Sequence, residues 1–211
     1  YEATGDNRWL EEAQEAAAHI LATKVGAEWY YDTLHSEVKG IIPVPGWAAG
    51  SYNGPVGEAY FLEDLYQVTG KQEYRDYVLY VADVLLEAAV EDEQGLHWSD
   101  QEDVTADGGF IVFLDHVYRR TGIKKYLDFA CKAADRIGKD TLDAPLGGKF
   151  WKLLDLSMID FPKETTFPNW SHGTTGTAWM FAVLYQDTKR EDYLKLAKAG
   201  LEYAMLSLIH I

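Results

Sequence analysis

Three copies of one segment follow each other along the chain, and this repeat constrains the fold more than any other feature. Each copy is anchored by a glycine, at Gly57, Gly109 and Gly176. A tyrosine stands nine residues after every anchor, and a second tyrosine stands 17 residues after it. These are Tyr66, Tyr118 and Tyr185, then Tyr74, Tyr126 and Tyr193. A recurring frame of this kind indicates a supersecondary unit that stacks on copies of itself.

Each copy predicts a pair of helices. Residues 59–66 after the first anchor are apolar on nearly all sides, which is typical of a buried helix. Gly70 and Gly122 then suit a left-handed helix C-cap, a place that Lys189 takes in the third copy. Residues 73–87 carry an apolar stripe spaced three and four apart. We therefore predict an all-α fold of helical hairpins, with Gly-rich turns before the inner helices, that stack into a solenoid or close into an α/α toroid.

The N-terminus fits the same frame. Tyr1, Gly5 and Trp9 have the spacing of the first tyrosine, the glycine and the second tyrosine in the later copies. We therefore expect the chain to begin inside a repeat and to be cut at both ends. Residues 1–205 are predicted to be the N-terminal part of one α/α-toroid domain, with about three and a half hairpins. Residues 206–211 depart from the helical pattern and are either a non-native tail or a short apolar helix end.

Composition limits the classes of function. The chain is 47% hydrophobic and 14% aromatic, which is enough for a real core and excludes disorder. Its net charge of −15 repels phosphate backbones and argues against nucleic acid as a partner. The single cysteine, Cys131, permits no intrachain disulfide and is interpreted as a small buried hydrophobe rather than a nucleophile. With no apolar run long enough for a membrane span and no visible signal peptide, we expect a cytoplasmic protein.

The sharpest local signal is Phe-Pro-Asn-Trp-Ser-His-Gly-Thr-Thr-Gly at residues 167–176. The glycines allow close backbone approach and expose N–H groups where an inner helix begins. The partial positive charge of a helix start favours a neutral imidazole at His172, which suits a general acid or base near pH 7. The alternative is a histidine that only caps the helix or hydrogen-bonds within its loop.

Further candidates lie in the connections that we expect at one rim. Glu102 and Asp103 precede the second anchor and are placed to relay protons or to orient the imidazole; the alternative is a solvated acidic loop. Asn53 and Trp170 are candidate binding residues by position alone. No two histidines have the spacing of a metal-binding pair on a helix, so we predict no metal ligand set from this chain.

The segment from Pro168 to Gly176, followed by an apolar helix ending in Leu184-Tyr185, resembles the lanthionine synthetase C-like family. The repeated units from Gly57 to Tyr74 and from Gly109 to Leu127 resemble it too, so the resemblance covers nearly the whole chain. It implies an α/α toroid with a zinc ion held by two cysteines and a histidine. In that family, zinc activates a Cys thiol, which adds to a dehydroamino acid in a peptide and closes a thioether ring.

The resemblance also assigns residues. His172 corresponds to the histidine of the family's Ser-His-Gly element, and Glu102 falls at the family's acidic position, with Asp103 one residue away. The family's zinc ligands lie in later repeats and match nothing here. The resemblance therefore implies zinc for the full-length protein, a peptide or a small thiol as substrate, and an inactive fragment.

Two alternatives stay open. One is an α/α-barrel carbohydrate-active enzyme, a glycoside hydrolase or sugar epimerase, with Trp47, Trp98, Trp151 and Trp170 stacking on sugars. The Ser-His-Gly turn argues against it, because that chemistry does not need such a turn. The other is a non-catalytic helical scaffold that binds peptide.

Overall fold

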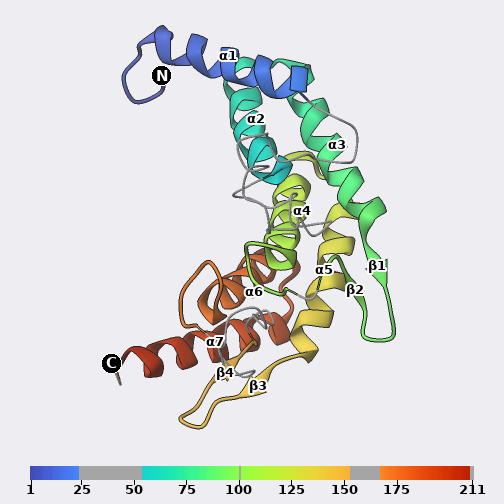
Figure 1. Ribbon diagram of the computed structural model, residues 1–211, viewed down its shortest axis with the longest axis vertical. Coiled ribbons are helices and arrows are strands. Elements are labelled where there is room, and N and C mark those ends of the chain that lie inside the picture. Colours follow the sequence, from blue (N-terminus) through green and yellow to red (C-terminus); the bar gives the residue numbers. More distant parts are fainter. Residues whose placement is uncertain (24–53, 100, 153–166, 210–211) are drawn as a thin grey trace, which may run out of the picture. The chain divides into compact units, whose positions relative to one another are not determined.

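A computed structural model describes residues 1–23, 54–99, 101–152 and 167–209, which form two compact units (Figure 1). The first unit is Tyr1–Val84 and the second is Leu85–Ile211. Within the described ranges the regular structure is helical apart from two short strand pairs. The prediction of an all-α fold built from paired helices is therefore confirmed.

The first unit contains α1 (Asn7–Thr23), α2 (Pro55–Thr69) and most of α3 (Gln72–Ala88). Helix α1 contacts α2. The pair α2 and α3 is joined by a buried ion pair in which Arg75 Nη2 lies 2.6 Å from Glu63 Oε1. Because a buried carboxylate is costly without a partner, this contact fixes α3 against α2.

The second unit contains two helical hairpins (Figure 1). Helix α4 (Asp107–Thr121) packs on α5 (Lys124–Lys139), and α6 (Thr174–Thr188) packs on α7 (Glu191–Ile209). The inner helices α4 and α6 also contact each other. The start of α6 is thereby brought towards the start of α4, which decides where the site lies.

All three inner helices begin and end at the same positions relative to their anchor glycine, and each ends in a threonine. Each begins two residues before its anchor glycine and contains 15 residues. The threonine hydroxyl donates to the carbonyl oxygen four residues earlier and accepts the N–H two residues later. The distance from the hydroxyl to the carbonyl oxygen is 2.7, 2.6 and 2.7 Å for Thr69, Thr121 and Thr188. The distance from the later main-chain nitrogen to the hydroxyl oxygen is 3.2 Å in each copy. The sequence repeat is therefore also a repeat of backbone capping.

The predicted left-handed caps are confirmed. Gly70 and Gly122 have φ of +68° and +72°, and Lys189 takes the same conformation with φ of +55°. Near the N-terminus, Gly5 has φ of +68° and donates its N–H to the oxygen of Tyr1 at 2.7 Å, as the other cap residues do four residues back. The frame proposed for residues 1–9 thus has the geometry of a repeat.

Two antiparallel strand pairs were not foreseen from the sequence. Strands β1 (Val90–Glu91) and β2 (Leu96–His97) follow α3, and β3 (Leu142–Asp143) and β4 (Lys149–Phe150) follow α5. They lie in the connections between hairpins and do not replace helices.

A tryptophan follows each strand pair and bonds back to the preceding outer helix. Trp98 Nε1 donates to the oxygen of Leu85 at 2.7 Å, and Trp151 Nε1 donates to the oxygen of Ile137 at 2.9 Å. Leu85 and Ile137 are separated by the same number of residues as Gly57 and Gly109, so they are equivalent repeat positions. The repeat unit therefore includes this tryptophan lock as well as the hairpin.

Helix α7 continues through residues 206–209, which the sequence left open between a non-native tail and a helix end; residues 210–211 lie outside the described ranges. Among the helices described, none has both the length and the apolar character needed to cross a membrane.

Candidate acid–base site

Main-chain contacts build the turn before α6. A Cβ atom at Gly173 would lie 1.9 Å from the oxygen of Phe167, and one at Gly176 would lie 1.9 Å from the oxygen of Trp170. Only glycine leaves room for these carbonyl groups. Thr174 N donates to the oxygen of Phe167 at 2.9 Å, so the segment folds back on the start of α6. The Gly-x-x-Gly spacing is thus a packing requirement.

This turn holds His172 by its backbone and aims its ring at the neighbouring hairpin. The N–H of His172 donates to Asn169 Oδ1 at 2.9 Å. Its Nδ1 lies 3.4 Å from Thr105 Oγ1 and 3.5 Å from Asp103 Oδ2, and 54% of the side chain is exposed. The N-cap of α6 is Gly173, which has no side-chain cap hydrogen bond, and the polar contacts of the His172 ring to described residues go to Thr105 and Asp103 before α4.

Asp103 is held firmly and is 6% exposed. Its Oδ1 accepts the N–H of Thr105 at 2.8 Å and the Thr105 hydroxyl at 2.5 Å, and its Oδ2 accepts Gln101 Nε2 at 2.8 Å. Its main-chain oxygen accepts the N–H of Gly108 at 3.0 Å, and a Cβ at Gly108 would lie 2.9 Å from that oxygen. The segment before α4 is therefore an ordered loop, and the alternative of a solvated acidic loop is wrong for Asp103.

Glu102 takes a different place from its neighbour. Burial, a side-chain hydrogen bond with Asp140 and the negative charge of Asp140 together raise the pKa of Glu102 to about 9. None of its polar contacts to described residues involves His172. Of the two acids considered from the sequence, the structure brings Asp103 to the imidazole.

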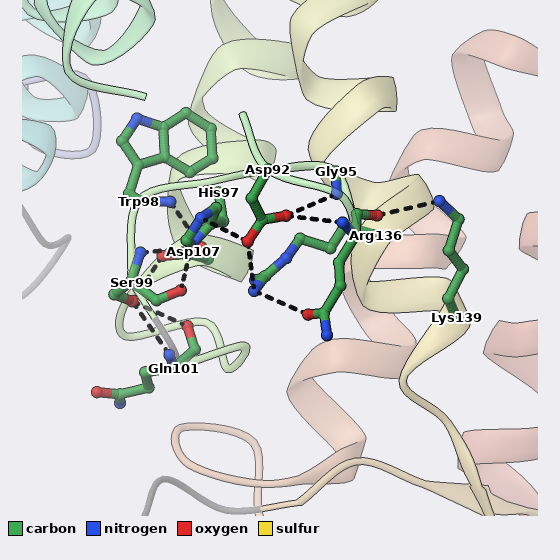
Figure 2. Close-up of polar contacts among 10 residues, drawn as sticks. Asp92, Gly95, His97, Trp98, Ser99, Gln101, Asp107, Arg136 and Lys139 are labelled. Atoms are coloured by element: carbon green, nitrogen blue, oxygen red, sulfur yellow. Dashed lines mark hydrogen bonds and ion pairs between the residues drawn. The ribbon is translucent and has the colours of Figure 1, made fainter. Parts of the chain in front are cut away.

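The loop is anchored at its other end by Asp107, the first residue of α4 (Figure 2). Asp107 Oδ2 accepts the N–H groups of Trp98 and Ser99 at 3.0 and 3.3 Å, and Oδ1 accepts the Ser99 hydroxyl at 2.7 Å. Burial raises the pKa of Asp107 to about 6 although these hydrogen bonds lower it. Asp107 was not singled out from the sequence, although its place at the expected start of a helix was an available signal.

The β1–β2 hairpin is in turn fixed to α5 (Figure 2). Lys139 Nζ donates to the oxygen of Gln94 at 3.0 Å, and Arg136 Nη2 donates to Gln94 Oε1 at 3.4 Å. Asp92 Oδ1 accepts the N–H groups of Gln94 and Gly95 at 2.8 and 3.0 Å and so closes the turn. The loop that carries Gln101, Asp103 and Thr105 therefore follows a strand pair that is itself held against α5.

The other predicted binding residues fare differently. Trp170 is exposed and packs against Trp179 with ring centroids 5.4 Å apart, while Asn53 lies outside the described residues. Trp151 is buried and stacks on Phe181, so its ring is not open to a sugar, whereas Trp98 is half-buried and its indole N–H is used by the oxygen of Leu85. Trp47 lies outside the described residues.

One protein family matches part of the chain. Residues 107–209, which comprise α4 to α7 and His172, match the family described as Lanthionine synthetase C-like protein. These residues form a lanthionine synthetase C-like domain. A comparison with curated proteins gave no match. The acidic loop with Gln101, Asp103 and Thr105 stands directly before the matched segment, and His172 lies inside it.

The described part of the chain offers no ligand set for zinc. No three His, Cys, Asp or Glu side chains in the described ranges gather into a group that fits a metal ion. The only cysteine, Cys131, is half-buried on α5, and burial raises the pKa of its thiol, which disfavours the thiolate that binds zinc. The zinc ligands that the resemblance implies are therefore not found among the described residues.

Proposed function

We propose that this chain carries the acid–base half of a lanthionine synthetase C-like cyclase. Such an enzyme adds a Cys thiol to a dehydroamino acid of a peptide and forms a thioether. The observation that carries the proposal is the contact of His172 Nδ1 with Asp103 and Thr105, with the rest of the ring open to solvent. A buried acid behind an exposed imidazole is a common arrangement for general acid–base catalysis.

The reaction requires a proton at a carbon atom. When the thiol sulfur bonds to the β carbon of the dehydroamino acid, the electron pair of the double bond moves to the α carbon and its carbonyl group. The α carbon must then receive a proton, while the thiol has lost one, so atoms and charge balance. A protonated His172 is placed to give its Nε2 proton to the α carbon, and solvent reprotonates the ring.

Asp103 supports this role without touching the substrate. Its Oδ2 lies 3.5 Å from Nδ1, so it accepts from that nitrogen and orients the ring. General acid–base catalysis of this kind contributes about 10²–10⁴-fold to a rate. Asp103 is therefore a positioning residue, and His172 is the catalytic residue.

Zinc belongs to this proposal only as a property of the full-length protein. Its ligands would have to come from outside the described residues, because no such group exists among them. The role of His172 concerns the proton of the α carbon and does not depend on which group activates the thiol. The exposed ring leaves room for either a peptide thiol or a small thiol.

The test uses the complete product of the native gene and a dehydrated peptide that contains one cysteine. Thioether formation is followed by loss of alkylatable thiol in mass spectrometry, because cyclisation leaves the peptide mass unchanged. We expect His172→Gln to slow cyclisation by about 10²–10⁴-fold and Asp103→Asn to slow it less. His19→Gln, on the exposed side of α1, is the matched control and should cyclise at the wild-type rate.

The stereochemistry at the α carbon gives a second readout. A proton delivered by a fixed imidazole reaches one face, so wild-type product should contain one diastereomer and His172→Gln product a mixture. Peptide binding without thiol loss in the wild type would favour the scaffold alternative. Cyclisation by His172→Gln at an undiminished rate and with one diastereomer would refute the proposal.

A further inference from the structure

The residues that face His172 Nδ1 are themselves ordered by a buried amide. Gln101 is 4% exposed, and its Nε2 lies 2.8 Å from Asp103 Oδ2 and 2.8 Å from Thr105 Oγ1. The amide nitrogen carries two hydrogens, so both contacts are satisfied at once. The opposite orientation of the amide would place its oxygen against the Asp103 carboxylate, which is repulsive. Gln101 therefore donates to both neighbours.

The hydroxyl proton of Thr105 is then assigned. Thr105 Oγ1 lies 2.5 Å from Asp103 Oδ1, and a carboxylate can only accept. The single hydroxyl hydrogen must point to Asp103, while one lone pair of the oxygen accepts from Gln101. The remaining lone pair of Thr105 Oγ1 faces His172 Nδ1, which lies 3.4 Å away.

Both groups in front of Nδ1 are consequently acceptors. Asp103 Oδ2 at 3.5 Å is a carboxylate oxygen, and Thr105 Oγ1 has no hydrogen left to give. The tautomer of a histidine is set by the hydrogen bond that one ring nitrogen makes. We infer that Gln101 and Thr105 are positioning residues that fix the proton of neutral His172 on Nδ1 and leave the lone pair of Nε2 facing outwards.

This inference rests on the proposed function for its purpose, since an outward Nε2 is the atom that would exchange protons with the substrate. It does not rest on that function for its test. The tautomer is a property of the resting chain, and neither zinc nor a substrate enters it. Gln101 was not singled out from the sequence, and neither was Thr105.

The experiment measures ring nitrogen shifts in the 211-residue chain labelled with ¹⁵N-histidine. Two-bond and three-bond ¹⁵N–¹H correlations distinguish a protonated nitrogen from a bare one, and His172→Gln identifies the signals of His172 among the six histidines. At a pH above the titration of the ring, we expect the wild type to show a protonated Nδ1 and a bare Nε2. A wild-type ring with its proton on Nε2 would overturn the inference by itself.

The variants ask which residues are responsible. Thr105→Val keeps the shape and removes the oxygen, so the ¹⁵N shifts should move towards the Nε2–H form; Thr105→Ser restores the hydroxyl and should return them. Gln101→Leu removes the donor that holds Asp103 Oδ2 and Thr105 Oγ1 in place, so both acceptors can move away from Nδ1, and the shifts should move in the same direction as in Thr105→Val. Gln186→Leu, on the exposed face of α6, is the matched control. Unchanged shifts in folded Thr105→Val would also overturn the inference.

The two proposals fail separately. If the chain shows the Nδ1–H tautomer but the complete protein cyclises peptide equally well with His172→Gln, this inference stands and the proposed function is wrong. If the chain shows the opposite tautomer but cyclisation depends on His172, this inference is wrong and the proposed function stands. Circular dichroism of each variant separates a local effect from unfolding, and if Gln101→Leu does not fold, the wild-type ring and the Thr105 pair still decide.

Discussion

The indole of Trp151 is tied to Ile137 by a hydrogen bond of 2.9 Å from Nε1 to the main-chain oxygen. It closes the end of α5 against the strand pair that follows, and the ring stacks on Phe181 of the next hairpin with centroids 5.6 Å apart. Trp98 makes the equivalent bond to Leu85 one repeat earlier. Trp98 also packs edge-on against Phe110 of α4 with centroids 5.4 Å apart, so each tryptophan joins an outer helix, a connection and the next inner helix.

We predict that Trp151→Phe lowers the free energy of unfolding by about 1–3 kcal/mol. The substitution removes the indole donor, so the Ile137 oxygen keeps only the N–H of Asp140 at 3.2 Å, and the smaller ring leaves part of a buried space unfilled. Urea unfolding followed by circular dichroism measures the effect. Trp170→Phe is the control, and because Trp170 is exposed we expect a change within about 0.5 kcal/mol. Equal stability of the two variants would contradict the role given to the lock.

A second prediction concerns the cap of α6. Lys189 adopts the left-handed conformation that glycine adopts at Gly70 and Gly122, and this conformation costs a residue with a Cβ about 1–2 kcal/mol. Lys189→Gly should therefore stabilise the chain by about 1 kcal/mol after the loss of the lysine contact with the Tyr185 ring. Gly122→Ala at the equivalent place should destabilise it by a similar amount. Destabilisation by both substitutions would show that the cap does not govern this position.

A third prediction is the pH dependence contributed by Glu102. Its pKa rises on folding from 4.5 to about 9, so its favourable contribution is complete below pH 4.5 and is lost as the pH rises through about 9. Glu102→Gln mimics the protonated acid and cannot ionise. The variant should match the wild type near pH 5 and exceed it near pH 9 by on the order of a few kcal/mol.

Unfolding midpoints in urea at several pH values measure this difference. Asp107 and Asp115, whose pKa values burial raises to about 6 and about 7, contribute a slope of the same sign at lower pH in both proteins. The difference between wild type and variant isolates Glu102. A wild-type stability that does not fall relative to the variant between pH 5 and pH 9 would refute the buried, protonated state of this acid.

A fourth prediction concerns the turn that carries His172. Gly173→Ala would place a Cβ 1.9 Å from a main-chain oxygen, so the turn must move. We expect a loss of about 2–4 kcal/mol in unfolding free energy and, in the complete protein, loss of cyclisation. Gly5→Ala is the control, because Gly5 has positive φ but open space around it, and about 1 kcal/mol is expected there. Similar losses for both substitutions would contradict the close approach.

The helical hairpins could be predicted from the sequence because the same residue types recur at the same spacing in each copy. The anchor glycines, the tyrosines and the cap positions recur without gaps, and the structure has helix limits in the same register. The tryptophan locks were missed for a physical reason. Trp98 stands 11 residues before its anchor and Trp151 stands 25 before its own, since the connections differ in length, so no gapless comparison aligns them.

The site was predicted as a set of residue types and not as a geometry. Glu102 and Asp103 are adjacent, and the choice between them depends on how the loop turns before α4, where Ala106 N bonds to the oxygen of Asp103 at 3.1 Å. That turn directs one carboxylate to His172 and the other to Asp140. Pairing with His172 also depends on a contact between residues 67 positions apart, from Thr105 to His172, which local pattern does not encode.

In the turn before α6, the path of the backbone does not depend on which side chains the turn presents. Its shape is set by carbonyl oxygens of Phe167 and Trp170 lying over two glycines, and any amino acid supplies a carbonyl oxygen. The side chains of Phe167 and Trp170 therefore do not set the path of the turn. We expect substitutions at these two positions to change the surface beside His172 while the backbone keeps the imidazole in place.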